Sequence, residues 1–217
     1  MKSHNAVETI KKVSLMLERK EKFAFVTYTR SAIFTLTGEL KGEKKPPKNF
    51  VKLLSDGMQK KDPNFIKAVQ KDLMLSSIDK LANLNLKGVE FYDPAFLELY
   101  INNNNYDVFK TFTSWYFKNT KAIVVSFQNQ NYIGKYFSPN SIFIEVPYND
   151  FYSKIESIAQ EINSHKDEYD LCILDCPMLS TALAVQVWDN TDMSIIDLGR
   201  TLTVARALGK NNDRARQ

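Results

Sequence analysis

Residues 170–199 read DLCILDCPMLSTALAVQVWDNTDMSIIDLG, and this stretch decides the fold. The segments 170–177 and 193–199 are short apolar runs, and the residues between them, 178–188, suit a helix. Strands that are apolar on both sides are buried on both faces, which is typical of a parallel sheet covered by helices. We therefore expect a strand–helix–strand unit with parallel strands.

The same alternation continues outward from this unit. Further strands are expected at FAFVTY (23–28), GVEFYD (88–93), AIVVSF (122–127) and SIFIEVP (141–147). Helices are expected at residues 6–20, 30–40, 48–60, 63–75, 94–101, 106–118, 150–164 and 201–210, with Asp62-Pro63 as a start signal and Asn149 or Asp150 as a cap.

The predicted fold is therefore α/β, with a Rossmann-like, mostly parallel sheet and helices on both faces. The sequence shows no internal repeat and no linker. We expect a single domain over residues 1–210, with a helical insertion at about 48–85 and a disordered basic tail at 211–217.

The composition is that of an ordinary globular protein. Of 217 residues, 44% are hydrophobic and 25% are charged, which argues against disorder. No apolar run approaches the length of a membrane span, and the N-terminal stretch lacks the apolar core and cleavage site of a secretory signal. Cys172 and Cys176 lie four residues apart on one predicted strand, too far apart for a disulfide. We expect a cytoplasmic protein with free thiols.

The net charge of +4 is mild and permits an anionic partner, such as a nucleotide or a nucleic acid, without requiring one. Four lysines cluster in one predicted loop, at positions 41, 44, 45 and 48, and five basic residues crowd the C-terminus. Both groups are also explained as solvated basic surface.

Polar side chains follow the predicted strands at the edge where ligands of parallel sheets bind, beyond the carboxyl ends. Amide, hydroxyl and guanidinium groups of this kind suit sugar hydroxyls and phosphates. The candidates for substrate binding are Tyr28, Thr29, Arg30, Ser31, Gln128, Asn129, Gln130, Pro177, Gly199 and Arg200.

Among these, Thr29-Arg30-Ser31 opens a predicted helix directly after a strand. A helix N-terminus offers free N–H groups and a partial positive charge, and an arginine there can hold a diphosphate in a bidentate manner. The alternative is that Thr29 or Ser31 only caps the helix and that Arg30 is solvated.

Two acids, Asp175 and Asp197, stand near the ends of apolar strands, and they are the candidate catalytic residues. Each could be a general base, an acceptor for sugar hydroxyls, or a cap for the next helix. No glycine-rich phosphate motif, G-x-S-x-G elbow or histidine–cysteine cluster is present, so a P-loop, a serine hydrolase and a zinc site are unsupported.

The stretch KFAFVTYTRSAIFTLTGEL (22–40) resembles the opening motif of the GT-D-type glycosyltransferases, which reads roughly aromatic-Val-Arg-aromatic-Gly-Asp-Gly-Glu. The segments FIEVP, YDLCILDCPMLSTALA and SIIDLG resemble later motifs of that family, in the same order over about residues 23–200. The family's Gly-Pro corresponds to Cys176-Pro177, and its final Asp-x-Gly corresponds to Asp197 and Gly199.

The resemblance departs at the family's Asp-x-Glu, which binds metal and the diphosphate, because Arg30 and Ala32 stand there. The resemblance implies a glycosyltransferase with a nucleotide-sugar donor and a glycan or DNA-base acceptor. Arg30 would replace the metal, Gln128, Asn129 and Gln130 would bind the nucleoside or sugar, and Arg200 would stabilise the leaving group.

Two alternatives remain open at this stage. One is a catalytically inactive descendant of the fold that serves as a binding or virion-associated structural protein. The other is a nucleic-acid-binding module that uses the basic loop and tail. The Asn- and Lys-rich, Gly-poor composition suits an AT-rich genome such as that of a phage, in which case the compartment is the host cytoplasm.

Overall fold

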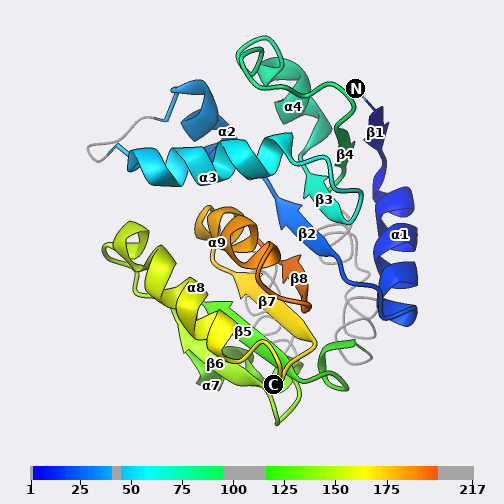
Figure 1. The fold of residues 1–217 in the computed structure, drawn as a ribbon, viewed down its shortest axis with the longest axis vertical. Coiled ribbons are helices and arrows are strands. Elements are labelled where there is room, and N and C mark those ends of the chain that lie inside the picture. The colour runs from blue at the N-terminus through cyan, green and yellow to red at the C-terminus, as the bar shows by residue number, and fades with distance from the viewer. Residues whose placement is uncertain (1, 41–44, 95–115, 200–217) are drawn as a thin grey trace, which may run out of the picture.

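The computed structural model describes residues 2–40, 45–94 and 116–199, and its strands form one eight-stranded sheet (Figure 1). The strand order is β1-β4-β3-β2-β8-β7-β5-β6, and every pair is parallel. The predicted parallel α/β fold is therefore confirmed. The strands are β1 (Lys2–His4), β2 (Ala24–Thr27), β3 (Phe65–Ala68), β4 (Glu90–Tyr92), β5 (Ala122–Ser126), β6 (Ile142–Glu145), β7 (Leu171–Asp175) and β8 (Ser194–Asp197).

Helices cover both faces of this sheet, as expected. One face packs against α2 (Arg30–Thr37), α3 (Lys48–Gln59), α4 (Lys71–Ser77), α8 (Ile155–Ser164) and α9 (Leu179–Trp188). The other packs against α1 (Ala6–Glu18) and α7 (Gln130–Ile133), which continues into a 3-10 turn, η2 (Gly134–Tyr136). A second 3-10 turn, η3 (Phe151–Lys154), precedes α8.

Alternation along β7 shows how the apolar runs serve both faces. Cys172 and Leu174 belong to the core under α3, α8 and α9, whereas Leu171 and Ile173 belong to the core under α1 and α7. All four side chains are at most 2% exposed. A strand buried on both faces leaves few places for polar side chains, which is why most of these strands read as continuous apolar runs.

The predicted helix at 63–75 is wrong, because its first part is strand β3, which lies between β2 and β4 in the sheet. The predicted insertion at 48–85 is therefore not purely helical. Lys67 lies in the middle of this buried strand at 3% exposure, and its ammonium group donates to the carbonyls of Lys60 and Phe65. Burial lowers the pKa of Lys67 to about 8.

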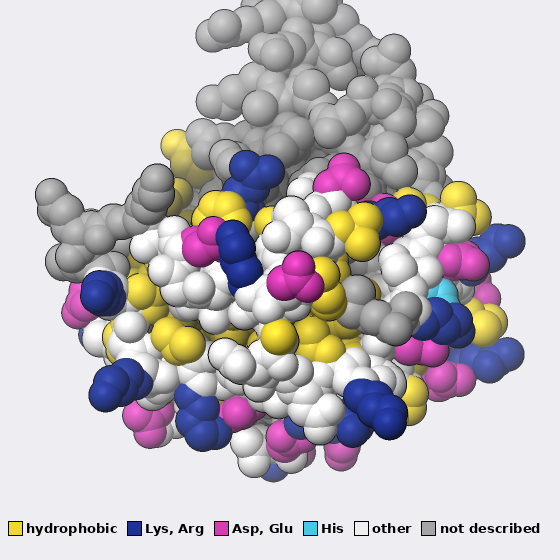
Figure 2. Space-filling view, turned by 90° about the horizontal axis from the view of Figure 1, so that it is seen from above, with side chains coloured by type: hydrophobic (Ala, Val, Ile, Leu, Met, Phe, Trp, Pro, Cys, Tyr) yellow, Lys and Arg dark blue, Asp and Glu magenta, His cyan; other side chains and the backbone are white. Residues whose placement is uncertain are grey.

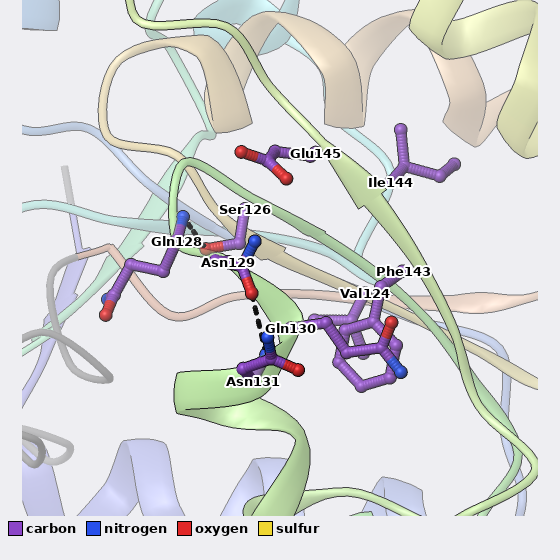
Figure 3. A pocket seen from close by; sticks show the side chains of 9 residues that line it. All are labelled: Val124, Ser126, Gln128, Asn129, Gln130, Asn131, Phe143, Ile144 and Glu145. Atoms are coloured by element: carbon purple, nitrogen blue, oxygen red, sulfur yellow. Dashed lines mark hydrogen bonds between the residues drawn. The ribbon is translucent and has the colours of Figure 1, made fainter.

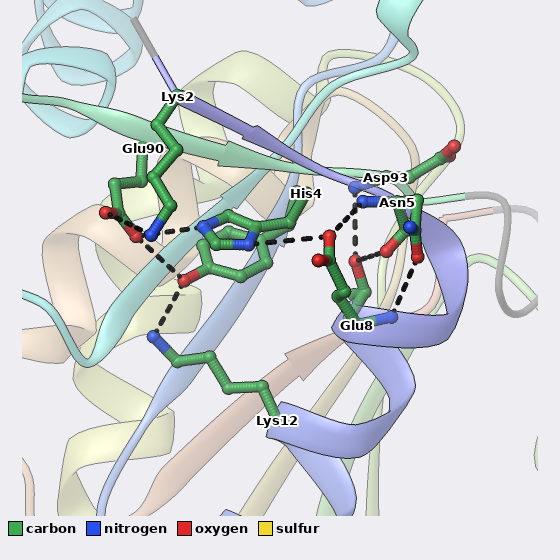
Figure 4. A network of polar contacts seen from close by, with 9 residues as sticks. Lys2, His4, Asn5, Glu8, Lys12, Glu90 and Asp93 are labelled. Carbon is green, nitrogen blue, oxygen red and sulfur yellow. Dashed lines mark hydrogen bonds and ion pairs between the residues drawn. The ribbon is translucent and has the colours of Figure 1, made fainter.

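The N-terminal strand β1 was not predicted, since its three residues are polar, and polar contacts hold it to β4 (Figure 4). Lys2 and His4 both bind the carboxylate of Glu90, at 3.2 and 3.0 Å. The His4 ring stacks on Tyr92 at 4.3 Å between ring centroids. The His4 hydrogen bond is the main reason that the pKa of Glu90 is lowered to about 2.

The sheet consists of two halves that come from separate parts of the chain. Strands β1, β4, β3 and β2 lie within residues 2–92, and strands β8, β7, β5 and β6 lie within residues 122–197. The halves are joined where β2 pairs with β8. The paired residues are Ala24 with Ile195 and Phe25 with Ile196. We call this junction the β2–β8 seam. Helix α3 of the first half packs on α9 of the second beside it.

Other predicted elements fall outside the described residues or shift slightly. The helices expected at 94–101, 106–118 and 201–210, and the tail, lie largely or wholly outside. Asp150 precedes η3 in a left-handed conformation with φ of 59°, and its side chain accepts from the Ser153 hydroxyl instead of capping a backbone N–H. No helix among the described residues has the length and apolar character of a membrane span.

Candidate functional site

The direction in which the chain leaves each strand marks the ligand-binding edge of the sheet. The chain leaves β5 toward α7 on one face, whereas it leaves the neighbouring strands β6 and β7 toward α8 and α9 on the other face. Connections that diverge in this way open a crevice at the carboxyl ends of the strands. The carboxyl end of β5 is therefore a topological switch point.

A hydrogen-bonded group of side chains occupies this switch point. Ser126 ends β5 and is paired in register with Asp175, the last residue of β7. The Ser126 hydroxyl donates to Asp175 Oδ2 at 2.8 Å, and the Gln128 side-chain amide donates to the same oxygen at 3.3 Å. The backbone N–H of Gln128 donates in turn to the Ser126 hydroxyl at 2.9 Å. Asp175 thereby positions two groups at the rim.

A polar cavity of about 240 Å³ opens beside this group. Figure 3 shows that its walls come from the loop after β5 together with α7 on one side, and from β6 on the other. Asn129 caps α7 by accepting from the backbone N–H of Asn131 at 2.9 Å. The lining residues are Val124, Ser126, Gln128, Asn129, Gln130, Asn131, Phe143, Ile144 and Glu145. All three predicted amides, at positions 128, 129 and 130, are thus brought together.

Glu145 is a candidate that was not predicted from the sequence. It is the last residue of β6, it is exposed, and it is paired in register with Ser126. Val124 and Phe143 precede Ser126 and Glu145 by two residues on their strands, and they are also paired in register. Side chains two residues apart on a strand lie on the same face, so the Glu145 carboxylate has apolar side chains beside it in the cavity. The signal that could have found Glu145 is its place directly before Val-Pro at the end of an apolar strand.

The helix start at Thr29-Arg30-Ser31 is confirmed as a structural feature. Thr29 is the N-cap of α2, and its hydroxyl accepts from the backbone N–H of Ala32 at 3.4 Å. Arg30 is exposed, and among the described residues its guanidinium has no hydrogen bond or ion pair. Strands β8 and β7 lie between β2 and β5, so this helix start is three strand spacings, about 14 Å, from the switch point.

Tyr28 is a correction to the predicted site. Its side chain is 1% exposed and lies in the core under α3, where the hydroxyl donates to the carbonyl of Leu54 at 3.1 Å. Burial raises the pKa of this phenol well above its usual value. The Tyr28 side chain is therefore held in the core and is not exposed at the carboxyl edge of the sheet.

Asp197 joins the two halves of the sheet beside the candidate site. Its two oxygens accept from the backbone N–H of Thr27 at 3.0 Å and of Gly199 at 2.8 Å. The side chain is 1% exposed, and burial raises its pKa to about 7 despite these hydrogen bonds. Gly199 is also buried and its N–H donates to Asp197, so this glycine supports the carboxylate, and its role in substrate binding stays a prediction. Arg200 lies outside the described residues.

Asp175 is likewise buried, at 2% exposure, so both predicted catalytic acids are held below the surface. Their catalytic roles stay predictions. Cys172 and Cys176 are buried free thiols, and burial raises the pKa of Cys172 to about 12 and that of Cys176 well above its usual value. Neither thiol has the character of a nucleophile.

The turn from β7 to α9 is strained directly after the predicted Pro177. Met178 has φ of 70° and ψ of −45°, a conformation that L-residues rarely adopt. Strained turns of this kind are concentrated at functional sites. Pro177 is half-buried in this turn, next to Asp175 and Cys176.

Basic and acidic side chains are mixed on the face of the molecule seen in Figure 2. Figure 2 shows lysine and arginine side chains interspersed with acidic ones over the face it views, so that face is not a continuous basic surface. Within residues 2–40, 45–94 and 116–199, no three His, Cys, Asp or Glu side chains form a group that could hold a metal ion.

Comparison with known proteins identifies the fold. No protein-family model and no curated sequence matches the chain. Three solved structures match 97% of it at 13% identity. One is described as a selenomethionine-substituted structure of domain of unknown function 1792, with 82% of its chain covered and a TM-score of 0.76. Another is a new glycosyltransferase of that domain family from Streptococcus sanguinis, with 85% covered and a TM-score of 0.73.

The third match is described as showing that this domain has a distinct glycosyltransferase fold, with 82% of its chain covered and a TM-score of 0.75. The resemblance to the GT-D type, which rested on short motifs in the sequence, is therefore confirmed at the level of the fold. At 13% identity the likeness extends to the arrangement of the chain and not to its individual residues.

Proposed function

We propose that this protein is a glycosyltransferase that uses a nucleotide-sugar donor. The observation that carries the proposal is the row of polar groups along one edge of a glycosyltransferase fold, from the exposed cation Arg30 at the end of β2 to the amide-lined cavity at the end of β5. A span of about 14 Å suits an extended ligand with a charged end and a polar, hydroxyl-rich end.

Arg30 and the start of α2 are proposed to bind the donor diphosphate. The guanidinium has no partner among the described residues, and it stands in the first turn of the helix, where backbone N–H groups lack partners within the helix apart from the N–H of Ala32, which Thr29 caps. Bidentate contact with phosphate oxygens is the interaction for which this side chain is best suited. Gln128, Asn129 and Gln130 would bind the nucleoside or the sugar hydroxyls in the cavity.

The GT-D type uses an Asp-x-Glu motif to bind a metal, and the residues at these positions do not fit that role. Arg30 is a cation and Ala32 has no donor atom, so this helix start would repel a divalent ion. We propose that Arg30 itself supplies the positive charge that the diphosphate leaving group needs. The carboxylates of Asp175 and Asp197 would then hold in place the side chains and backbone N–H groups that they accept hydrogen bonds from at the carboxyl ends of the strands.

A thermal-shift screen tests this proposal. The nucleotides UDP, GDP, CMP and dTDP and their sugar conjugates are added to wild type and to Arg30→Ala, each with and without manganese. A ligand at about 100 times its dissociation constant stabilises the protein by about 2.7 kcal/mol, which raises the melting temperature by about 5–10 °C. We expect one nucleotide to do so without manganese, and Arg30→Ala to lose the effect.

Arg19→Ala is the matched control, because Arg19 is another exposed arginine, at the end of α1. It should keep the full nucleotide response. If no nucleotide raises the melting temperature of wild type, the transferase proposal is wrong, and the inactive descendant of the fold becomes the better reading. A response that requires manganese would contradict the role given to Arg30.

A further inference from the structure

A run of aromatic rings leads from the core to an exposed tyrosine that follows β6. Tyr148 follows β6 and is 72% exposed, and its ring stacks on Phe127 with 5.1 Å between centroids and 21° between planes. Phe127 contacts the edge of Phe151, and Tyr152 continues the run to the fully buried Phe50. We call the pair of Tyr148 and Phe127 the aromatic platform.

The platform is rigid and open at the same time. Phe127 covers one face of the Tyr148 ring, and the half-buried ring of Phe151 contacts Phe127 in turn. With 72% of Tyr148 exposed, the ring is available to a ligand. Stacking on a ring that is already held in place costs little conformational entropy. Tyr148 contributes little to the core, so its position is more useful for binding than for stability.

The platform borders the cavity along the chain. Phe127 stands between Ser126 and Gln128, which both line the cavity, and Tyr148 follows the lining residue Glu145 by three positions. A ligand that reached both the Tyr148 ring and the cavity would meet an apolar ring face together with amide and carboxylate oxygens. A pyranose ring has the same division, with an apolar C–H face and a polar rim of hydroxyl groups, and so has a nucleobase.

The local charge favours an uncharged sugar over a base of a nucleic acid. Residues 143–156 carry three acids, Glu145, Asp150 and Glu156, against one base, Lys154. An excess of acids repels the phosphates that accompany every base in a nucleic acid. An uncharged sugar meets no such repulsion, and carboxylates and amides accept and donate hydrogen bonds to its hydroxyls.

Distance separates the platform from the proposed donor phosphates. Four strand spacings lie between β2, which carries Arg30, and β6, which precedes Tyr148, a separation of about 19 Å along the sheet. The cavity on β5 lies between them. A donor that reaches from Arg30 into the cavity ends at β5, so we assign the outer face of Tyr148, one strand further on, to the second substrate.

We propose that the aromatic platform is a subsite for an uncharged sugar ring of a glycan acceptor, which stacks on Tyr148 and hydrogen-bonds the rim of the cavity. This inference rests on the proposed transferase function, and it selects a glycan over a DNA base as the acceptor. It also assigns Tyr148 as a residue that determines acceptor affinity.

The test measures sugar binding in the absence of any nucleotide. Saturation-transfer NMR and titration calorimetry are carried out with methyl hexopyranosides and linear di- and trisaccharides on wild type, Tyr148→Phe, Tyr148→Leu and Tyr148→Ala. We expect at least one sugar to bind, Tyr148→Phe to bind within about twofold of wild type, and the Leu and Ala variants to bind about tenfold more weakly. Melting temperatures should agree, because the side chain is exposed.

Tyr132→Ala provides a control with another exposed tyrosine, on α7, and should bind sugar as wild type does. The inference is overturned if no sugar of the panel binds, or if Tyr148→Ala binds as well as wild type. It is also overturned if a single-stranded oligothymidylate binds through Tyr148 and the sugars do not. If wild type binds sugar through Tyr148 but shows no thermal shift with any nucleotide, the proposed donor site is contradicted and the sugar subsite is not.

Discussion

Replacement of Gly57 by alanine should weaken the contact between α3 and α9 that lies beside the β2–β8 seam. A Cβ atom at position 57 would stand 2.4 Å from Val185 Cγ2 and 2.6 Å from the hydroxyl of Tyr28. Real Cβ atoms do not approach other atoms so closely, so the helices must move apart or the neighbouring side chains must leave their positions. Tyr28 is bound to Leu54 and cannot move without loss of that hydrogen bond.

The magnitude follows from three contributions. Overpacking of a core by one methyl group costs about 1–3 kcal/mol. Loss of the bond from Tyr28 to Leu54 costs about 1 kcal/mol. Alanine in a helix gains about 1 kcal/mol over glycine, which offsets the second contribution. The expected destabilisation is therefore about 2 kcal/mol, or about 4–8 °C in melting temperature for a chain of this size.

Urea denaturation of Gly57→Ala and wild type measures this difference. Tyr28→Phe in the Gly57→Ala background removes one of the two clashing atoms, so the double variant should lose less than the sum of the single variants. Gly134→Ala is the matched control, because a Cβ there meets only Gln130 and Phe143 at ordinary contact distances. A Gly57→Ala protein as stable as wild type, or more stable, would refute the close approach of α3 and α9.

Two further predictions concern the candidate site. Burial raises the pKa of Asp197 from 3.8 to about 7, so between these pH values the folded state keeps a proton that the unfolded state has lost. This group's contribution to the unfolding free energy therefore falls by about 3 kcal/mol as the pH rises from 4 to 7. Chemical denaturation should show the advantage of wild type over Asp197→Asn shrinking over that range, and a constant difference would contradict it. At Met178, glycine relieves the strain of a positive φ that alanine retains, so Met178→Gly should be about 1 kcal/mol more stable than Met178→Ala in urea, whereas equal midpoints would rule out strain at this turn.

Strands were predicted correctly where the residue types themselves indicate burial, and they were missed where polar residues are buried or paired. Strands β5 and β7 were predicted because burial on both faces makes every position apolar. Strand β3 was missed because Lys67 occupies its centre, where the ammonium group is satisfied by two carbonyls that are visible only in the folded chain. Strand β1 was missed because polar contacts, not apolar burial, hold it to β4.

The site was predicted in part for similar reasons. The amides of residues 128–130 were found because they directly follow an apolar strand, and the structure brings them to one cavity. Tyr28 was assigned to the site because the sequence does not reveal which face of β2 lies under α3. Tyr148 belongs to no motif, and Glu145 was given no role although it lies within FIEVP. Only the register of β6 with β5 and the ring stacking point to these two residues.

The β2–β8 seam also determines when the site comes into existence. Residues 2–92 provide Arg30, and residues 122–197 provide the cavity and the platform, so neither half of the chain contains a complete row of binding groups. Pairing of Ala24 with Ile195 closes a loop that contains most of the chain, and such distant pairings form late and slowly. During synthesis on the ribosome, the two ends of the binding edge therefore meet only after β8 has emerged, and a chain that stops before residue 194 has no site to expose.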